Sequence, residues 1–341
     1  MKKIGITTTV PLEVLLAAGY QPVDLNNIFI SDDRTERLVS AAEKAGFPLN
    51  CCSWIKGIYG TVMEHGIDTV LGVTTGDCSN TLMLMEVLKL RGVRTIPFAY
   101  PDKPDPTQMQ KALDELANVL GTTMEAADKV REQLKPCREL AWKLDEMTWK
   151  DNLVGGYENH LWLVSASDFN RDYGTYQREL GELIEKRLAA QPYPQDYLRI
   201  AFLGVPSVYG KDLYNFLEKN GARVVYNEIQ RQFAMPHPGK SLAEQYSRYT
   251  YPYSVYDRLE DIQPELEKRR VDGVIHYVQA FCHRGIGDII FRDAIELPIL
   301  TLEGNDDFTL TQHLKTRVEA FVDMLQRQQR KTKIAQGGIK Q

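Results

Sequence analysis

Cysteine is scarce in this sequence of 341 residues, which contains five. They are Cys51, Cys52, Cys78, Cys137 and Cys282. An odd and low number argues against a disulfide framework and leaves two interpretations: metal or redox chemistry, or packing as small buried hydrophobes. Two of the five are adjacent, in NCCSWIKGIYG. Because neighbouring side chains on an extended chain point to opposite faces, at most one of them is expected to face a given site.

Long hydrophobic runs and an excess of positive charge are also missing. No stretch approaches the roughly 18 apolar residues that a membrane-spanning helix needs. The start, MKKIGITTTV, is not followed by the apolar core of a secretory signal. The formal net charge is −5 and no basic patch stands out, which argues against a general nucleic-acid-binding protein. We expect a cytoplasmic protein with no membrane or nucleic-acid partner.

The common phosphate-binding motifs are missing as well. No G-x-G-x-x-G follows a predicted strand, and there is no Walker A sequence. The chain is therefore not expected to bind a dinucleotide or ATP itself.

What the sequence does contain is an alternation of short apolar runs and longer helical patterns, which predicts βαβ units and parallel sheets. The alternation occurs twice, on either side of a mostly helical stretch that begins after PDKPDPT and ends at AAQPYPQDY. The predicted fold is α/β, with two similar Rossmann-like parallel-sheet lobes. The predicted boundaries are 1–105 for the first lobe, 106–195 for the helical segment, 196–327 for the second lobe and 328–341 for a flexible tail.

The two alternating regions resemble each other at one fixed offset. IDTVLGVTTGDCSN (67–80) aligns with VDGVIHYVQAFCHR (271–284), and 271 − 67 = 204. The same offset aligns Cys78 with Cys282 in the sequence, and each lies just beyond the carboxyl end of a predicted strand. Ligands of open parallel sheets bind at these strand ends. If the two lobes face each other, the two cysteines meet across one inter-lobe cleft.

Spacing restricts what such cysteines can bind. Zinc sites normally use close pairs such as C-x2-C, whereas adjacent Cys51 and Cys52 cannot comfortably chelate one ion, and His283 beside Cys282 has the same difficulty. An iron–sulfur cube can take single cysteines from separate segments, and it usually has four thiolates. Three thiolates would leave one iron open to water or substrate. The spacing alone therefore favours a cluster over zinc without fixing its ligands.

Five segments occur in a characteristic order along the chain. They are ITTTVPLEVLLAAGYQPVDL, CSWIKGIYG, GVTTGDCSNT, YVQAFCHRGIGD and LPILTLEGNDDFTLTQHLKTRVEAFVDML. Together, over Ile4 to Leu325, they resemble the 2-hydroxyacyl-CoA dehydratase and benzoyl-CoA reductase family, in its activator-dependent iron–sulfur D-component type. The resemblance covers most of the chain.

The resemblance implies a [4Fe–4S] cluster in the inter-lobe cleft. Matched residue by residue, its ligands are Cys52, Cys78 and Cys282. Cys51 is either a packing residue or an alternative or additional ligand. Cys137 lies in a helical pattern outside the matched segments, and we predict that it is structural.

The resemblance also implies partners and a reaction. An ATP-hydrolysing iron–sulfur activator protein supplies one low-potential electron, and the enzyme works anaerobically as a homodimer or as a heterodimer with a related subunit. Members form a ketyl radical from a 2-hydroxyacyl-CoA and expel water, or reduce aromatic thioesters or small molecules. We expect a lyase or reductase of the 2-hydroxyacyl-CoA dehydratase type that acts on an acyl-CoA or another small molecule.

Three alternatives stay open at this point. The first is a non-catalytic [4Fe–4S] electron-transfer or cluster-carrier protein, which should have a fourth ligand and no substrate pocket. The second is a double-cubane-type reductase, whose larger cluster needs more thiolates than the five available here unless subunits share them. The third is a cluster-free α/β binding module.

Candidate catalytic residues were sought at strand ends and beside the cysteines. Glu303, with Asp306, and Glu228 follow predicted strands and could serve as acids or bases, or could be a solvated turn and a structural carboxylate. His283 is a candidate proton donor beside Cys282, whereas His276 in GVIHYV is expected to be a core histidine. The tyrosines of YSRYTYPYSVYDR could cover a ligand pocket or pack in an interface.

Overall fold

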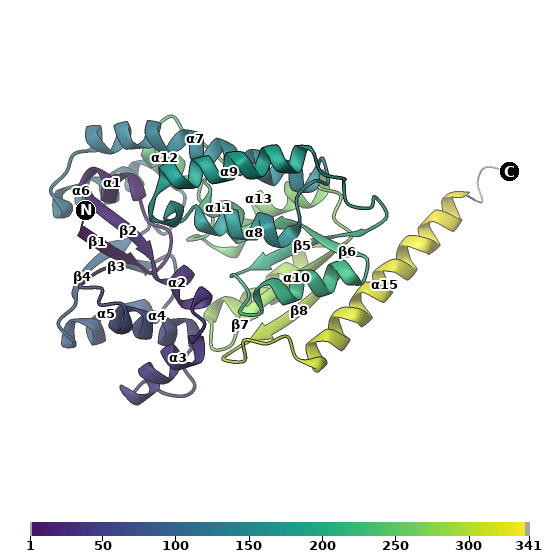
Figure 1. Ribbon diagram of the computed structural model, residues 1–341, viewed down its shortest axis with the longest axis horizontal. Helices are drawn as coiled ribbons and strands as arrows, with labels where there is room; N and C mark the ends of the chain where they lie inside the picture. The colour runs from purple at the N-terminus through teal and green to yellow at the C-terminus, as the bar shows by residue number, and fades with distance from the viewer. Residues whose placement is uncertain (1, 338–341) are drawn as a thin grey trace.

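Two four-stranded parallel sheets form the framework of the protein. The computed structural model describes residues 2–337, and Figure 1 shows the two sheets side by side, with the first near the N-terminus. The first sheet has the order β2 (Tyr20–Asp24), β1 (Lys2–Ile6), β3 (Thr69–Thr75), β4 (Arg94–Ala99). The second has the order β6 (Ala222–Asn227), β5 (Leu198–Gly204), β7 (Gly273–Gln279), β8 (Ile299–Gly304). The predicted α/β fold with two similar lobes is confirmed.

The internal repeat predicted from the sequence is present in the topology. In each sheet the first strand along the chain lies between the second and the third, and the fourth strand lies at the edge. The first and last residues of β7 are each 204 positions after those of β3, which is the offset found in the sequence, since 273 − 69 = 204 and 279 − 75 = 204. Strand β2 was not predicted, because it is short and contains Pro22, which an edge strand tolerates.

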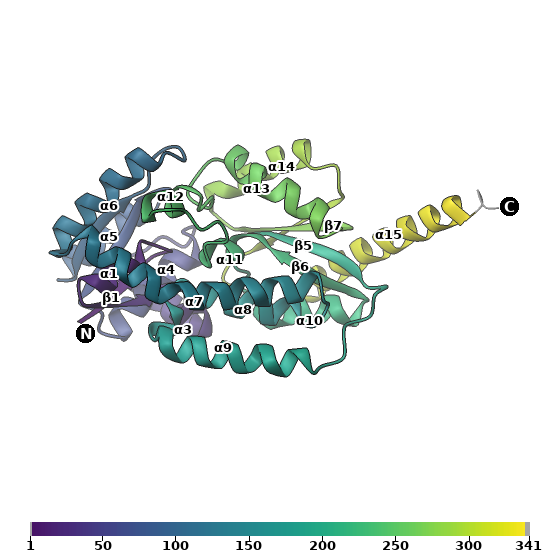
Figure 2. The same cartoon turned by 90° about the horizontal axis from the view of Figure 1, so that it is seen from above.

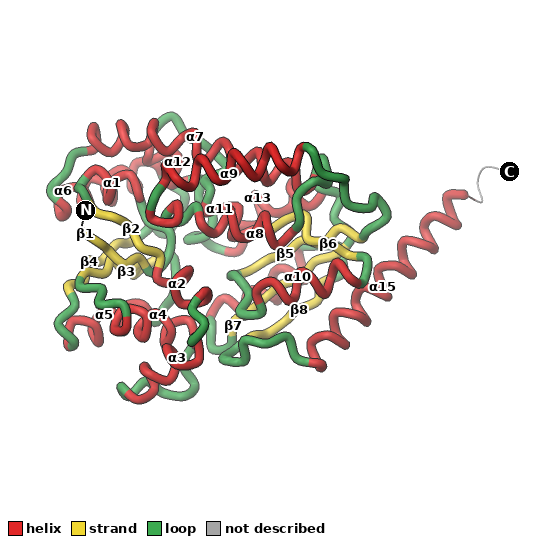
Figure 3. Tube along the Cα trace, viewed as in Figure 1, coloured by secondary structure: helices red, strands yellow, loops and turns green. Residues whose placement is uncertain are grey.

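Helices surround both sheets (Figure 3). Those of the first lobe are α1 (Leu12–Ala17), α2 (Leu25–Ser31), α3 (Thr35–Lys44), α4 (Ser53–Glu64) and α5 (Thr81–Leu90). The middle segment contains α6 (Pro106–Leu120), α7 (Met124–Trp149), α8 (Gly156–Ser165), the 3-10 turn η1 (Phe169–Arg171) and α9 (Tyr173–Leu188). The second lobe contains α10 (Gly210–Lys219), α11 (Glu228–Phe233), α12 (Leu242–Ser247), α13 (Val255–Lys268), the 3-10 turn η2 (His283–Gly287), α14 (Asp288–Ala294) and α15 (Gln312–Gly337).

The long helix α7 joins the two lobes. Figure 2 shows it running along the molecule from the first lobe to the second. Arg138 on α7 pairs with Glu13 on α1 at 2.6 Å, and both side chains are buried. Asp145, two helical turns further on, pairs with Arg269 beyond α13 at 2.5 Å. Helix α7 is thus attached by a buried ion pair to each lobe, and removing one partner of such a pair costs several kcal/mol.

The C-terminal segment is helical. Helix α15 continues as far as Gly337, into the stretch 328–341 that was predicted to be a tail. Residues such as Gln, Arg and Lys are good helix formers, so a polar composition alone does not end a helix. Residues 338–341 of the predicted tail lie outside the described residues. Among the described helices, none combines the length and hydropathy needed to cross a membrane.

Candidate functional site

A cavity of about 370 Å³ lies between the two lobes. Its walls include the segments that follow the central strands of both sheets: Thr7 and Thr8 after β1, Asp77 and Cys78 after β3, 205–210 after β5, and 282–284 after β7. Helix α8 of the middle segment closes one side with His160, Leu161 and Val164. The position agrees with the rule that parallel sheets bind ligands at the carboxyl ends of their strands.

The structure brings Cys52, Cys78 and Cys282 to this one cavity. Each of them stands at the start of a helix: Cys52 is the N-cap of α4, Cys282 is the N-cap of η2, and Cys78 lies in the turn that leads into α5. Burial raises the pKa of Cys78, and the charges of Asp77, Cys52 and Cys282 raise it further. Helix N-termini favour negative charge, so all three positions suit a thiolate that has a positive partner.

The sulfur of Cys78 accepts a hydrogen bond from the backbone N–H of Asn80, two residues further along the chain, with an N to Sγ distance of 3.4 Å. Backbone N–H groups at the starts of α4 and η2 also oppose the rise that burial causes in the pKa of Cys52 and Cys282, although neither side chain forms an N-cap hydrogen bond. Hydrogen bonds of this type stabilise sulfur ligands of a metal cluster.

Burial opposes ionisation of the three thiols. It raises the pKa of Cys52 to about 11 and also raises the pKa of Cys78 and Cys282, while the backbone N–H groups act in the opposite direction. The free thiols are therefore neutral near pH 7, and a thiolate forms here when a positively charged partner binds. Within residues 2–337, no three His, Cys, Asp or Glu side chains are close enough to bind a single metal ion.

The remaining two cysteines lie elsewhere. Cys51 is half-buried beside the apolar cluster under α4 and α5, and it does not line the cavity. Cys137 is buried on α7, where its Sγ donates a hydrogen bond to the carbonyl oxygen of Tyr173 at 3.3 Å. This agrees with the structural role predicted for Cys137. Of the adjacent pair, only Cys52 lines the cavity.

The predicted acids and bases have different environments. His283 lines the cavity, and partial burial and the charge of Arg284 lower its pKa. The side chain of Glu303 is exposed and does not line the cavity. The backbone carbonyl oxygen of Glu303 accepts a hydrogen bond from the hydroxyl of Tyr209. Asp306 is likewise exposed.

Glu228 was predicted to face the cleft, and the structure buries it elsewhere. It forms two 2.8 Å hydrogen bonds with the guanidinium of Arg258 and accepts a third from the backbone N–H of Gly204. It does not line the cavity. The position of Glu228 after a strand indicated the correct edge of the sheet, but it did not reveal that the carboxylate pairs with Arg258. His276 is the core histidine expected, with Nδ1 2.7 Å from Asp288 and its ring against Phe291.

A polar cluster joins the lobes beside the cysteines. Arg284 donates to the carbonyl oxygen of Gly76 at 3.0 Å, and its guanidinium lies 4.3 Å from the ring centre of Tyr251. The hydroxyl of Tyr251 donates to Asp77 at 2.7 Å. Burial raises the pKa of Asp77, and the charge of Arg284 opposes this. One tyrosine of the predicted tyrosine-rich segment thus lines the cavity.

His160 was missed by the sequence interpretation. Its Nδ1 lies 2.8 Å from the hydroxyl of Tyr214, which itself donates to the side-chain oxygen of Asn227 at 2.7 Å. Because that tyrosine proton is used, Nδ1 carries the histidine proton and Nε2 has the lone pair. Among the described residues, no side chain or backbone group hydrogen-bonds to Nε2, and His160 is buried and lines the cavity. Burial lowers its pKa to about 4, so the ring is neutral.

The protein consists of two α/β lobes with the same strand order, which meet at a cavity lined by three cysteines. It therefore belongs to a class of two-lobed proteins whose site lies at the interface between the lobes. The comparison with protein families then identifies the class more closely. The chain belongs to the family described as 2-hydroxyglutaryl-CoA dehydratase, D-component, whose model matches residues 7–325. The match spans both lobes and all three cavity cysteines, and it confirms the resemblance found in the sequence. The comparison with curated proteins gives no match.

Proposed function

We propose that this protein is the iron–sulfur component of a 2-hydroxyacyl-CoA dehydratase-like enzyme. It accepts a low-potential electron from an ATP-hydrolysing activator protein and performs a radical dehydration or reduction of an acyl-CoA. The observation that carries the proposal is that three single cysteines, two from the first lobe and one from the second, line one cavity between the lobes. Membership of a dehydratase family supports the same conclusion.

The residues present fit a [4Fe–4S] cluster held by Cys52, Cys78 and Cys282. Each thiolate of a cube binds a different iron, so the sulfurs must stand further apart than the ligands of one ion, in agreement with the absence of a single-ion site in residues 2–337. The buried thiols also need a positive partner to ionise. When bound, the cluster would supply the electron that makes the thioester substrate reactive.

The cavity favours an enzyme over a cluster carrier. A carrier needs a fourth ligand and no substrate pocket, whereas Cys51 does not line this cavity of about 370 Å³, and the cavity wall extends well beyond the three cysteines to α8 and to the loop after β5. Trp54, Ile58 and Val208 provide apolar wall that excludes water. We assign to His160 Nε2 the role of accepting a hydrogen bond, or a proton, from the substrate, because that atom is neutral and faces no protein partner.

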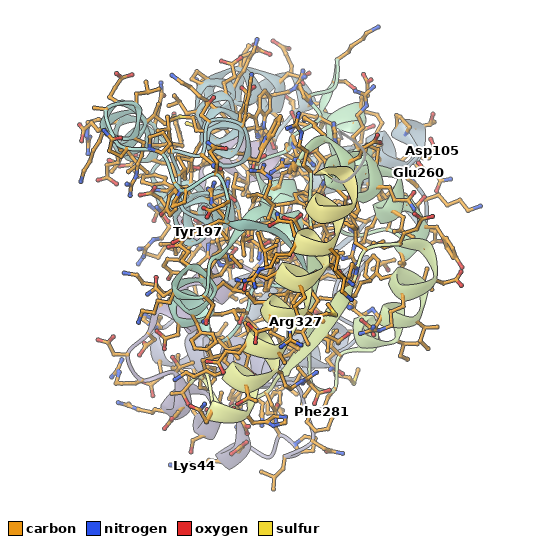
Figure 4. The ribbon with its side chains drawn as sticks, turned by 90° about the vertical axis from the view of Figure 1, so that its right-hand side faces the viewer. Lys44, Asp105, Tyr197, Glu260, Phe281 and Arg327 are labelled. Atoms are coloured by element: carbon orange, nitrogen blue, oxygen red, sulfur yellow. The ribbon has the colours of Figure 1, made fainter. Side chains whose placement is uncertain are left out.

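We place the activator on an exposed apolar surface outside the cysteines. Phe281, directly before Cys282, is 54% exposed and has a φ of 63°, a backbone conformation that is strained for phenylalanine. Figure 4 shows it in the lower part of the view, above Lys44. Ile286 and Ile289 after Cys282, and Met83 after Cys78, are also exposed. An electron donor that covers these side chains would approach the cysteines closely.

The proposed docking surface can be tested by comparing a substitution within it with a substitution of an exposed residue outside it. Phe281→Ser should slow electron delivery from the activator while leaving the iron content unchanged. Leu90→Ser, at the far end of α5 and 80% exposed, is the control and should have no effect. Equal rates in both variants would place the activator elsewhere.

The proposed function itself is tested by anoxic purification. We expect about four irons and four sulfides per chain, and a visible spectrum that bleaches when a cognate activator, ATP and a strong reductant are added. Absence of iron would exclude the proposal. Iron without a spectral response to the activator, together with transfer of the cluster to an apo-protein, would establish a carrier instead.

A further inference from the structure

Gln279, the last residue of β7, is buried in the wall of the cavity, and every hydrogen-bonding position of its side chain is in use. Its Oε1 accepts from Nε1 of Trp54 at 3.2 Å and from the hydroxyl of Tyr277 at 2.8 Å. Its Nε2 donates to Oγ of Ser53 at 3.0 Å and to the carbonyl oxygen of Asn305 at 3.2 Å. A glutamine amide has two N–H donors and two acceptor positions, so no part of this side chain is left to bind a ligand.

The side-chain contacts of Gln279 cross from the second lobe to the first beside one of the cysteines. Ser53 and Trp54 are the first two residues of α4, and they follow Cys52 directly. Ser53 also donates its own hydroxyl to the carbonyl oxygen of Asn305, just beyond β8, at 2.9 Å. The start of α4 is therefore joined by hydrogen bonds to the ends of two strands of the second sheet.

The backbone of the same glutamine holds a cysteine of the second lobe. The N–H of Cys282 donates to the carbonyl oxygen of Gln279 at 3.0 Å. One residue thus contacts the segment of Cys52 through its side chain and the segment of Cys282 through its backbone. Because both contacts are made by protein atoms alone, they are present without any bound group.

The internal repeat indicates that the strand itself does not require a glutamine at this position. Thr75 is the equivalent residue of β3, since 279 − 75 = 204. Thr75 is exposed at the end of its strand, whereas Gln279 is buried. The buried amide belongs to the lobe whose strand end faces the start of α4, which points to a role between the two cysteine segments.

We infer that Gln279 is a positioning residue that sets the separation of Cys52 from Cys282 before a cluster binds. The inference rests on the proposed function, because the two thiols are ligands only if the protein holds an iron–sulfur cluster. Residues that orient metal ligands through hydrogen bonds typically change metal affinity by about 10- to 100-fold. Without the amide of Gln279, the start of α4 is no longer held against the segment that contains Cys282, and the cluster must bind to thiols that are not kept at its own spacing.

Hydrogen–deuterium exchange of the cluster-free protein tests the inference without iron. In Gln279→Leu, the backbone amides of 56–59 and 282–285 should exchange about tenfold faster than in the unmodified protein, because the hydrogen bonds that join these segments are lost. The amides of 80–84 should keep their rate, since Arg284 joins that part of the first lobe to the second. Equal acceleration in all three segments would show that Gln279 only stabilises the contact between the lobes, and would overturn the inference.

Gln230→Leu is the matched control. Gln230 is fully buried on α11 and does not line the cavity, and neither polar atom of its side chain has a hydrogen-bond partner among the described residues. The control therefore removes a buried amide of the same size without removing a hydrogen bond, and exchange at the cysteine segments should not change. Equal rates in Gln279→Leu and Gln230→Leu would contradict the inference. If Gln279→Leu does not fold, Ser53→Ala removes one of the same contacts and should accelerate the same two segments to a smaller extent.

Release of iron to a chelator is the second measurement, and it separates the inference from the proposed function. After anoxic reconstitution, Gln279→Leu should lose iron at least about tenfold faster than Gln230→Leu. Equal rates of iron loss from the two variants would overturn the inference. If the unmodified protein binds no iron while exchange is accelerated in Gln279→Leu, the proposed function fails and the contact between the two cysteine segments stands.

Discussion

The two lobes have the same strand order but differ at the helix that leads into the third strand. In the first lobe this helix is α4, whose N-cap is Cys52 and whose N-terminus has no side-chain cap. In the second lobe it is α13, whose N-cap Ser254 forms a capping box with Asp257. The first lobe thus lacks a stabilising cap at the position where its thiol faces the cavity. We infer that this position serves the site in one lobe and local stability in the other.

A second pair of equivalent positions shows the same division. Asp24 is the last residue of β2, and Glu228, at the same offset since 228 − 24 = 204, is the first residue after β6. Glu228 is neutralised by Arg258, whereas Asp24 lines the cavity and is held by the hydroxyl of Ser167 and by backbone N–H groups. The buried carboxylate is structural in the second lobe and is available to the site in the first.

The largest expected effect comes from removing a thiol that lines the cavity. Cys52→Ser, Cys78→Ser and Cys282→Ser should each lose most of the iron and the visible absorbance of anoxically purified protein, because a serine hydroxyl is a much poorer ligand than a thiolate. The two lobes should be equally necessary. Iron retained in Cys282→Ser would remove the second lobe from the site.

Cys51 and Cys137 provide the controls. Cys137→Ser should leave iron and spectrum unchanged, since its sulfur contacts Tyr173 inside the helical segment. Cys51→Ser should retain the cluster, because Cys51 does not line the cavity. Loss of iron in Cys51→Ser but not in Cys52→Ser would show that the wrong member of the pair was assigned.

The next largest effect concerns the equivalent carboxylates. Glu228→Gln leaves Arg258 buried without its partner and should lower the free energy of unfolding by about 3–5 kcal/mol. Asp24→Asn should lower it far less, because no described cation pairs with Asp24 and burial raises the pKa of that carboxyl. Guanidinium chloride unfolding of the two cluster-free variants measures both. Similar losses would contradict the division of roles between the lobes.

His160 belongs to neither lobe, and we expect it to make the stability of the protein depend on pH. Its pKa is about 6.5 in an unfolded chain and about 4 in the folded protein, so the unfolded state binds the proton first as the pH falls. The stability that neutral His160 contributes is therefore present above pH 6.5 and is lost progressively between pH 6.5 and pH 4. Between pH 7 and pH 5, His160→Gln should lose about 2 kcal/mol less stability than the unmodified protein. Equal pH dependence would mean that the ring is not held neutral.

Much of the fold was accessible from the sequence because strands buried in parallel sheets appear as continuous apolar runs. The offset between VTTGDCSN and YVQAFCHR located both third strands, and with them Cys78 and Cys282. Strand β2 gave no such run, since Pro22 interrupts it at the edge of the sheet. Helical propensity beyond Gln326 was likewise hidden by the polar composition of the chain end.

The cavity wall was less accessible, because it depends on contacts between distant segments. His160 has no local signal, and its role follows from the packing of α8 against Tyr214 and Asn227. The pairing of Glu228 with Arg258, thirty residues further along the chain, is equally invisible in the local pattern of a strand end. Single residue types at strand ends identify the edge of the sheet, and tertiary packing decides which side chains reach the cavity.

The smallest expected effect concerns the two N-cap residues, Cys52 of α4 and Ser254 of α13. Ser254→Ala removes the capping box of α13 and should lower the free energy of unfolding by about 1 kcal/mol. Cys52→Ser places a capping hydroxyl at the start of α4, where Cys52 forms no side-chain cap, and should leave the stability of the cluster-free protein unchanged or slightly higher.

Both variants should be measured by denaturant unfolding after removal of iron, so that cluster binding does not contribute to stability. The same Cys52→Ser substitution that abolishes the cluster would then be neutral or stabilising without it. This combination is expected only if the cysteine is present for its ligand chemistry. A loss in cluster-free Cys52→Ser as large as that in Ser254→Ala would instead show that the thiol stabilises the first lobe by packing, and that the two helix starts are not exchanged in function.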